Sequence, residues 1–131
     1  MSAQPLTVLV VEDDPHLRMA LCDALSSARM AAVGVADGGA ALDHLTFEAA
    51  PDAVVLDLRL PVLDGWALLG WMRGDAGLRH VPVVVVSGAP LEHVELVEPL
   101  EPTACLRKPV GAAELLRVLH QLLGVRRDEP G

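Results

Sequence analysis

The sequence is poor in aromatic residues. Its 131 residues include two Trp, one Phe and no Tyr. A hydrophobic core must therefore be built mainly from Val, Leu and Ala, which is feasible because 52% of the residues are hydrophobic. A chain of this length with so many apolar residues is expected to fold as one compact domain.

Cysteines and targeting signals are equally scarce. The two cysteines, Cys22 and Cys105, have neither the number nor the spacing of a disulfide framework or a zinc site. Residues 1–5 carry no basic stretch followed by an apolar run, so no secretion signal is expected. No apolar run approaches the roughly 18 residues of a membrane-spanning helix. These absences predict a reduced protein in the cytoplasm.

Positive charge is the third shortage. The chain has 10 Lys and Arg residues against 18 Asp and Glu residues, which gives a formal net charge of −8. Such a chain is a poor direct partner for a nucleic acid or an anionic membrane surface, because both would repel it.

Four short apolar runs locate the candidate functional residues, because polar residues follow each run. Residues 7–11, 54–56, 83–86 and 104–107 read as strands, and the wholly apolar run 54–56 reads as a strand buried on both faces. The carboxyl ends of parallel strands meet at one edge of a sheet, which is the usual ligand crevice of an open α/β fold. That edge would gather the polar residues that follow the four runs, namely Asp13, Asp14, Asp57, Ser87 and Lys108.

Helical patterns alternate with the strands. They cover about 15–28, 38–49, 65–72, 91–97 and 111–123, and a weaker strand is expected at 31–35. Right-handed crossovers then place helices on both faces of the sheet. We predict an α/β, flavodoxin-like fold: a doubly wound parallel sheet of five strands in the order 2-1-3-4-5, with five helices. The domain would span 6–124, and 125–131 would form a polar C-terminal tail.

The clustered acidic residues call for a cation. Two carboxylates about 4 Å apart repel each other by roughly 4 kcal/mol at an effective dielectric near 20. Lys108 supplies one positive charge, and a divalent ion would supply the rest. Oxygen ligands favour Mg²⁺ or Mn²⁺ over zinc, and no His follows any of these strands. With this support, Asp57 can act as a nucleophile and form an acyl phosphate, with Ser87 donating to a phosphoryl oxygen.

These motifs together resemble the receiver domain of bacterial two-component response regulators. Each motif is weak alone, but their order and spacing are specific, and the resemblance covers about residues 6–124. It rests on Glu12-Asp13-Asp14, on the run from Asp57 to Gly65, on Ser87-Gly88 and on Lys108-Pro109.

The resemblance implies a role for each matching position of the metal site. Asp57 matches the phosphoacceptor. Asp14 matches a direct Mg²⁺ ligand, and Asp13 matches the acidic partner that acts largely through water. The backbone carbonyl of Arg59 matches the third protein ligand.

The resemblance also implies a switch and a phosphodonor. Ser87 matches the switch hydroxyl, Lys108 matches the phosphate-binding lysine, and the Lys108–Pro109 bond matches a cis peptide. The donor would be a phosphohistidine on a sensor histidine kinase or a phosphotransfer protein, and the signal would be carried by altered protein binding to an effector.

Two features depart from the family pattern. Cys105 stands where receivers usually have an aromatic ring that moves with the switch hydroxyl, and we expect it to be a small core residue. The segment 91–103 contains two prolines, which predict a short or displaced fourth helix.

Three other functions compete with this interpretation. A pseudo-receiver would keep the fold and act as a phosphorylation-independent interaction module. A phosphatase of the haloacid-dehalogenase type would need a second Asp two residues after the nucleophile, but that residue is Arg59. A flavin-binding protein would need a phosphate-binding loop after the first strand, where Glu12, Asp13 and Asp14 would repel a phosphate.

Overall fold

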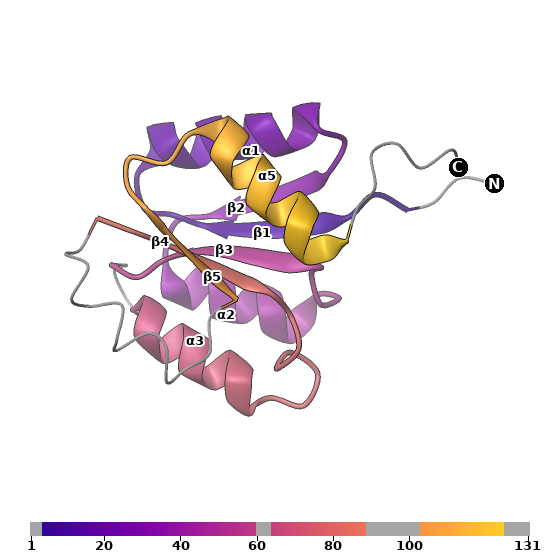
Figure 1. Cartoon of the computed structure of the whole chain (residues 1–131). Coiled ribbons are helices and arrows are strands. Elements are labelled where there is room, and N and C mark those ends of the chain that lie inside the picture. The colour runs from indigo at the N-terminus through magenta and orange to yellow at the C-terminus, as the bar shows by residue number, and fades with distance from the viewer. Residues whose placement is uncertain (1–3, 60–63, 89–102, 125–131) are drawn as a thin grey trace.

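The computed structural model describes residues 4–59, 64–88 and 103–124, and it shows strands alternating with helices (Figure 1). In chain order the elements are β1 (Thr7–Val11), α1 (Pro15–Ser27), β2 (Ala31–Val35), α2 (Gly38–Phe47), β3 (Ala53–Asp57), α3 (Gly65–Gly74), β4 (Val83–Ser87), β5 (Ala104–Arg107) and α5 (Ala112–Leu123).

The five strands form one parallel sheet in the order β2-β1-β3-β4-β5, which confirms the predicted topology. Its register brings the functional positions together. Val11 at the end of β1 pairs with Leu56 of β3, and Asp57 pairs with Val86 of β4. Glu12, Asp57 and Ser87 therefore follow or end neighbouring strands at the same edge of the sheet.

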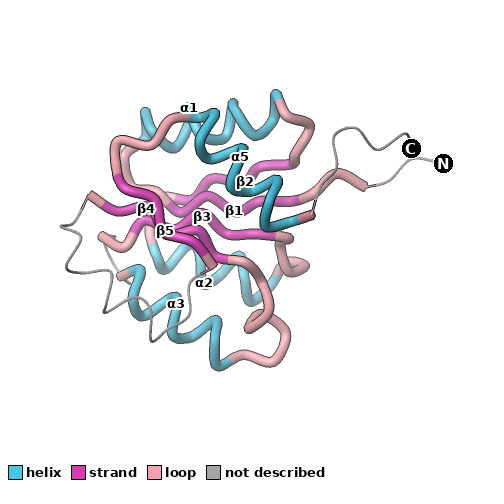
Figure 2. Tube along the Cα trace, viewed as in Figure 1, coloured by secondary structure: helices cyan, strands magenta, loops and turns pink. Residues whose placement is uncertain are grey.

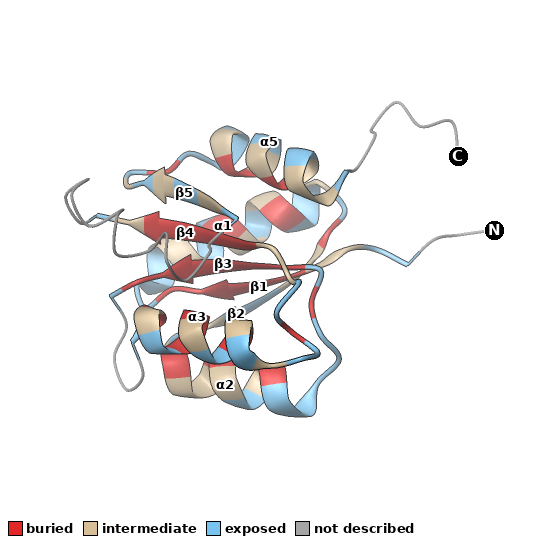
Figure 3. Cartoon of the chain, turned by 60° about the horizontal axis from the view of Figure 1, so that its bottom comes forward, coloured by how far each residue is buried: buried red, intermediate tan, exposed pale blue. Residues whose placement is uncertain are grey.

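Two layers of helices cover the sheet (Figures 1 and 2). Helices α1 and α5 lie on one face, and α2 and α3 lie on the other. Successive residues of β1 alternate between the two hydrophobic cores, with Val8 and Val10 in the α1/α5 core and Leu9 and Val11 in the α2/α3 core. Figure 3 shows the central strands largely buried between these layers. All five residues of β3 are buried, as its apolar sequence predicted.

Helices α1, α2 and α3 each begin at an aspartate whose side chain caps the first turn. Asp14 accepts hydrogen bonds from the backbone N–H groups of His16 and Leu17 at the start of α1, and Pro15 occupies the first turn. Asp64 caps α3 in the same manner by accepting from the N–H of Ala67. Aspartate caps thus fix where α1 and α3 start.

The prediction that Cys105 is a core residue is wrong, because this residue is exposed. β5 is the last strand of the sheet, and burial alternates along it. Ala104 and Leu106 pack against the α1/α5 core, while Cys105 and Arg107 are exposed. The helix expected at 91–97 lies outside the described residues.

Candidate functional site

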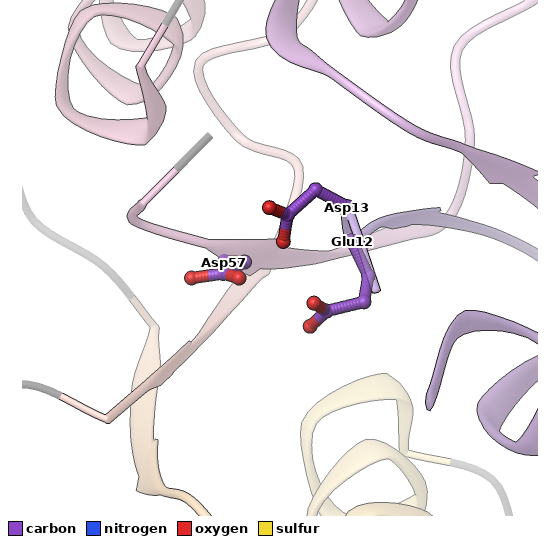
Figure 4. A group of neighbouring side chains, drawn as sticks. All are labelled: Glu12, Asp13 and Asp57. Atoms are coloured by element: carbon purple, nitrogen blue, oxygen red, sulfur yellow. The ribbon is translucent and has the colours of Figure 1, made fainter. Parts of the chain in front are cut away.

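The candidate site lies where β1 and β3 end. Glu12 directly follows β1, and Asp57 is the last residue of β3. They are the buried charged residues of the described chain, with exposed fractions of 2% and 4%. Figure 4 shows the carboxylates of Glu12, Asp13 and Asp57 on the same side of the strand ends. Burying two like charges so close together requires nearby positive charge.

Three carboxylates form a group that suits a metal ion. One oxygen from each of Glu12, Asp13 and Asp57 lies within 4.8 Å of the others. This set of oxygen donors fits a hard divalent cation such as Mg²⁺. The group contains Glu12 in place of Asp14, which differs from the sequence-based expectation. The reason is local: the Asp14 side chain is turned to the first N–H groups of α1, as a helix cap.

Three contacts hold the carboxylate of Glu12. Its Oε2 accepts from the backbone N–H of Asp14 at 3.1 Å. Its Oε1 lies 3.1 Å from the Nζ of Lys108, which also donates to Oε2 at 3.3 Å. Burial raises the pKa of Glu12, and the negative charge of Asp57 raises it further, against the lowering effect of the Asp14 N–H and of Lys108. The Asp14 N–H and Lys108 therefore both favour the ionised form of Glu12.

Lys108 joins the two buried carboxylates. Its Nζ donates to Oδ2 of Asp57 at 3.1 Å as well as to Glu12. Burial alone would lower the pKa of Lys108, but its hydrogen bonds to Asp57 and Glu12 and their negative charges outweigh this, and the pKa is raised. Lys108 is also the only lysine in the chain. The ammonium group is thus fixed as a cation beside Asp57.

The remaining predicted residues lie around Asp57. The backbone N–H of Arg59 donates to Oδ1 of Asp57 at 2.9 Å, so the two carboxylate oxygens of Asp57 have different partners. Ser87 ends β4 next to β3, and its carbonyl accepts from the N–H of Lys108 at 2.9 Å. The Lys108–Pro109 peptide bond is cis, as the resemblance implied. The structure thus brings Asp57, Asp13, Lys108, Ser87 and the Arg59 backbone to one edge.

Sequence reasoning missed the part played by Glu12, which it quoted only as a motif residue. A usable signal was present in the Asp14-Pro15 pair. A proline in the first turn marks the preceding residue as the helix cap, and a capping carboxylate is already engaged by backbone N–H groups. The acidic pair nearest to Asp57 is therefore Glu12 and Asp13.

Comparison with known proteins gives the family. The sequence model of the response regulator receiver domain matches residues 8–120. The chain belongs to the response regulator receiver domain family. Within the described residues, no helix has the length and apolar character needed to cross a membrane.

Individual relatives agree with this assignment. The chain is 34% identical over 126 residues to the sensor histidine kinase TmoS of Ectopseudomonas mendocina, covering 95% of this chain but only 13% of TmoS. It is 27% identical over 123 residues to the polar-differentiation response regulator DivK of Brucella anthropi, covering 92% of this chain and 98% of DivK. The chain therefore matches a small part of one relative and nearly all of the other.

A solved structure resembles the chain closely in fold. The receiver domain of the sensor histidine kinase PA1611 from Pseudomonas aeruginosa superposes with a TM-score of 0.84 and 30% identity, covering 92% of this chain and 99% of that domain. That structure has a magnesium ion coordinated in its active site cleft.

Gly65 supports the site from α3, and we predict that Gly65→Ala is destabilising. A Cβ at this position would lie 2.5 Å from the carbonyl oxygen of Asp57 and 2.6 Å from the Cα of Leu58. Backbone atoms cannot rotate away as side chains can, so the variant should lose about 1–3 kcal/mol of unfolding free energy. Urea denaturation measures this loss.

Gly70→Ala is the matched control, because it makes the same change within α3. A Cβ at Gly70 meets nothing within 4 Å, and alanine favours a helix interior over glycine by roughly 1 kcal/mol. Gly70→Ala should therefore be stabilising. Equal unfolding free energies for the two variants would show that Gly65 is not packed against the Asp57 backbone.

Proposed function

We propose that this domain accepts a phosphoryl group on Asp57 in a Mg²⁺-dependent reaction and signals through altered protein binding. The observation that carries the proposal is the contact of Asp57 with Lys108 at 3.1 Å, beside the carboxylates of Glu12 and Asp13. A buried carboxylate with one cation beside it and a group of metal ligands around it suits a nucleophile for phosphoryl transfer.

The proposed transfer is a displacement at phosphorus. A carboxylate oxygen of Asp57 attacks the phosphorus atom of a phosphohistidine, the P–O bond forms, and the P–N bond to the imidazole breaks. The leaving imidazole takes the electron pair and is protonated. Lys108, which donates to Asp57, would hold the negative phosphoryl oxygens, and Ser87 at the end of β4 would donate to one of them.

The donor set fits a divalent ion. Glu12, Asp13 and Asp57 would hold the ion, together with the backbone carbonyl of Arg59 that the family resemblance suggests. When bound, Mg²⁺ supplies positive charge that favours the approach of a phosphoryl group to an anionic site. In the absence of that charge, Lys108 is the cation that pairs with both buried carboxylates.

The partner and location follow from this role and stay predictions. A histidine kinase or a phosphotransfer protein would supply the phosphoryl group, consistent with the similarity to part of TmoS. The output would be a protein rather than a nucleic acid, in line with the net charge of −8, and the site would work in the cytoplasm. That Cys105 occupies the position of the usual aromatic switch residue also stays a prediction.

Intact-protein mass spectrometry after incubation with acetyl phosphate and Mg²⁺ tests the proposal. We expect one added phosphoryl group in the wild type and none in Asp57→Asn or with a chelator. Asp23→Asn, an exposed carboxylate on α1, is the matched control and should be modified like the wild type. If neither an adduct nor Mg²⁺-dependent binding of beryllofluoride is found, the chain acts as a pseudo-receiver and the proposal is overturned.

A further inference from the structure

A contact from α1 reaches the backbone of the acidic turn. The Nη1 of Arg18 donates to the carbonyl oxygen of Glu12 at 2.8 Å. This arginine lies just over one turn into α1, and its side chain returns to the end of β1. The contact is not part of the phosphoryl chemistry proposed above, because it involves a main-chain carbonyl and no carboxylate.

The opposite side of the Arg18 side chain is bounded by β2. A Cβ added to Gly34 would lie 3.0 Å from Cγ of Arg18 and 3.0 Å from Sγ of Cys22. Gly34 therefore leaves the space through which the Arg18 stem passes. The stem of Arg18 thus packs closely against β2, beside Cys22.

We infer that Arg18 is a positioning residue for the divalent cation site. The inference rests on the proposed function, since it concerns the metal that Glu12, Asp13 and Asp57 would hold. The backbone of Glu12 is fixed at both ends, because its N–H donates to the carbonyl of Val35 at 3.1 Å while its carbonyl accepts from Arg18. These two contacts set the direction in which the chain leaves β1.

The direction of the chain after Glu12 determines where Asp13 points. The Glu12 carbonyl belongs to the peptide unit that joins Glu12 to Asp13, so a rotation of that unit moves the Asp13 carboxylate relative to Asp57. Arg18 holds the unit through a charge-assisted hydrogen bond, which is stronger than one between neutral groups. Loss of this bond should weaken metal binding without removing any ligand.

Titration with Mg²⁺ alone, followed through the amide NMR signals of Asp13 and Asp57, measures this effect without any phosphoryl transfer. Arg18→Met keeps an unbranched stem and removes the donor, and we expect its dissociation constant to rise about tenfold, as for residues that orient metal ligands. Arg18→Lys, which keeps a charged donor, should lie between Arg18→Met and the wild type. Arg117→Met, an exposed arginine on α5, is the control and should bind Mg²⁺ like the wild type.

Two further readouts separate positioning from a general loss of stability. The Mg²⁺ concentration for half-maximal phosphorylation by acetyl phosphate should rise in Arg18→Met, while the rate at saturating Mg²⁺ should stay near that of the wild type. Gly34→Ala should shift the dissociation constant in the same direction by a smaller factor, because it displaces the Arg18 stem. Cys22→Ala controls for the effect of Gly34→Ala on the neighbouring thiol.

The outcomes distinguish this inference from the proposed function. A folded Arg18→Met variant with a dissociation constant within twofold of the wild type overturns the inference and leaves the proposed function intact. If Arg18→Met does not fold, an unchanged constant in Gly34→Ala overturns it instead. A wild type that binds no Mg²⁺ contradicts both.

Discussion

Lys108→Met is expected to lower the free energy of unfolding by about 2–3 kcal/mol near neutral pH. The residue is 27% exposed, while the carboxylates of Glu12 and Asp57 that it joins are almost fully buried. Removing one partner of a fully buried ion pair costs about 3–5 kcal/mol, and the partial exposure of Lys108 reduces this figure. The same variant should be phosphorylated roughly 100-fold more slowly, because the cation beside the phosphoryl oxygens is lost.

The stability difference between the wild type and Lys108→Met should depend on pH in a defined direction. Because the pKa of Lys108 is raised, its contribution to the unfolding free energy is fully present below pH 10.5. That contribution is lost as the pH rises through the pKa of Lys108 in the folded state. The raised pKa of Glu12 means that protonation favours the folded state, so lowering the pH towards 4.5 relieves the unpaired carboxylate of the variant. The difference should therefore be largest between the raised pKa of Glu12 and 10.5.

Urea denaturation of both proteins across this pH range measures the difference. Lys108→Arg is the matched control, because it keeps the charge and should lose less stability than Lys108→Met. Because the chain has a single lysine, NMR of lysine-labelled protein gives the pKa of Lys108 directly. A stability difference that does not change with pH would contradict the coupling of Lys108 to Glu12 and Asp57.

Asp13→Asn is expected to weaken Mg²⁺ binding by at least about 100-fold. A carboxylate about 4 Å from a divalent ion contributes several kcal/mol to the binding free energy at an effective dielectric near 20. In the absence of metal, the same change should raise the unfolding free energy slightly, by less than about 1 kcal/mol, since Asp13 is exposed and its repulsion from Asp57 is screened. A variant that unfolds less readily but binds Mg²⁺ more weakly would show that Asp13 serves metal binding and not stability.

Asp14→Asn is the matched control for Asp13→Asn. Asparagine is as good a helix cap as aspartate, so the start of α1 should be preserved. We expect its Mg²⁺ dissociation constant to stay within about threefold of the wild type, since the longer-range loss of one charge is small in water. A titration in which Asp14→Asn binds Mg²⁺ more weakly than Asp13→Asn would restore the ligand role that the sequence suggested for Asp14.

Much of the fold was predictable because the strands have a strong and simple signal. The apolar runs of β1, β3 and β4 predict strands, and the polar residues after them predict the functional edge. Asp57 and Lys108 were found for this reason, since Asp57 ends β3 and Lys108 directly follows β5.

The structure differs from the sequence-based predictions in two situations. In one, neighbouring residues offer the same chemistry, and in the other, a residue lies on a strand at the edge of the sheet. Glu12, Asp13 and Asp14 are three consecutive acids, and only the geometry of the turn decides that Asp14 caps α1 while Glu12 bonds to Lys108. Cys105 lies on an edge strand, where one face packs against helices and alternate residues are exposed. The contact from Arg18 to the Glu12 carbonyl involves a main-chain atom, which no sequence pattern reveals.

Borohydride reduction of the phosphorylated protein tests the central claim most directly. Borohydride converts an aspartyl phosphate to homoserine, and peptide mass spectrometry then locates the modified residue. We predict homoserine at position 57 alone, formed only when both acetyl phosphate and Mg²⁺ are present. Homoserine at another position, or a phosphoryl adduct that resists reduction, would show that Asp57 is not the acceptor.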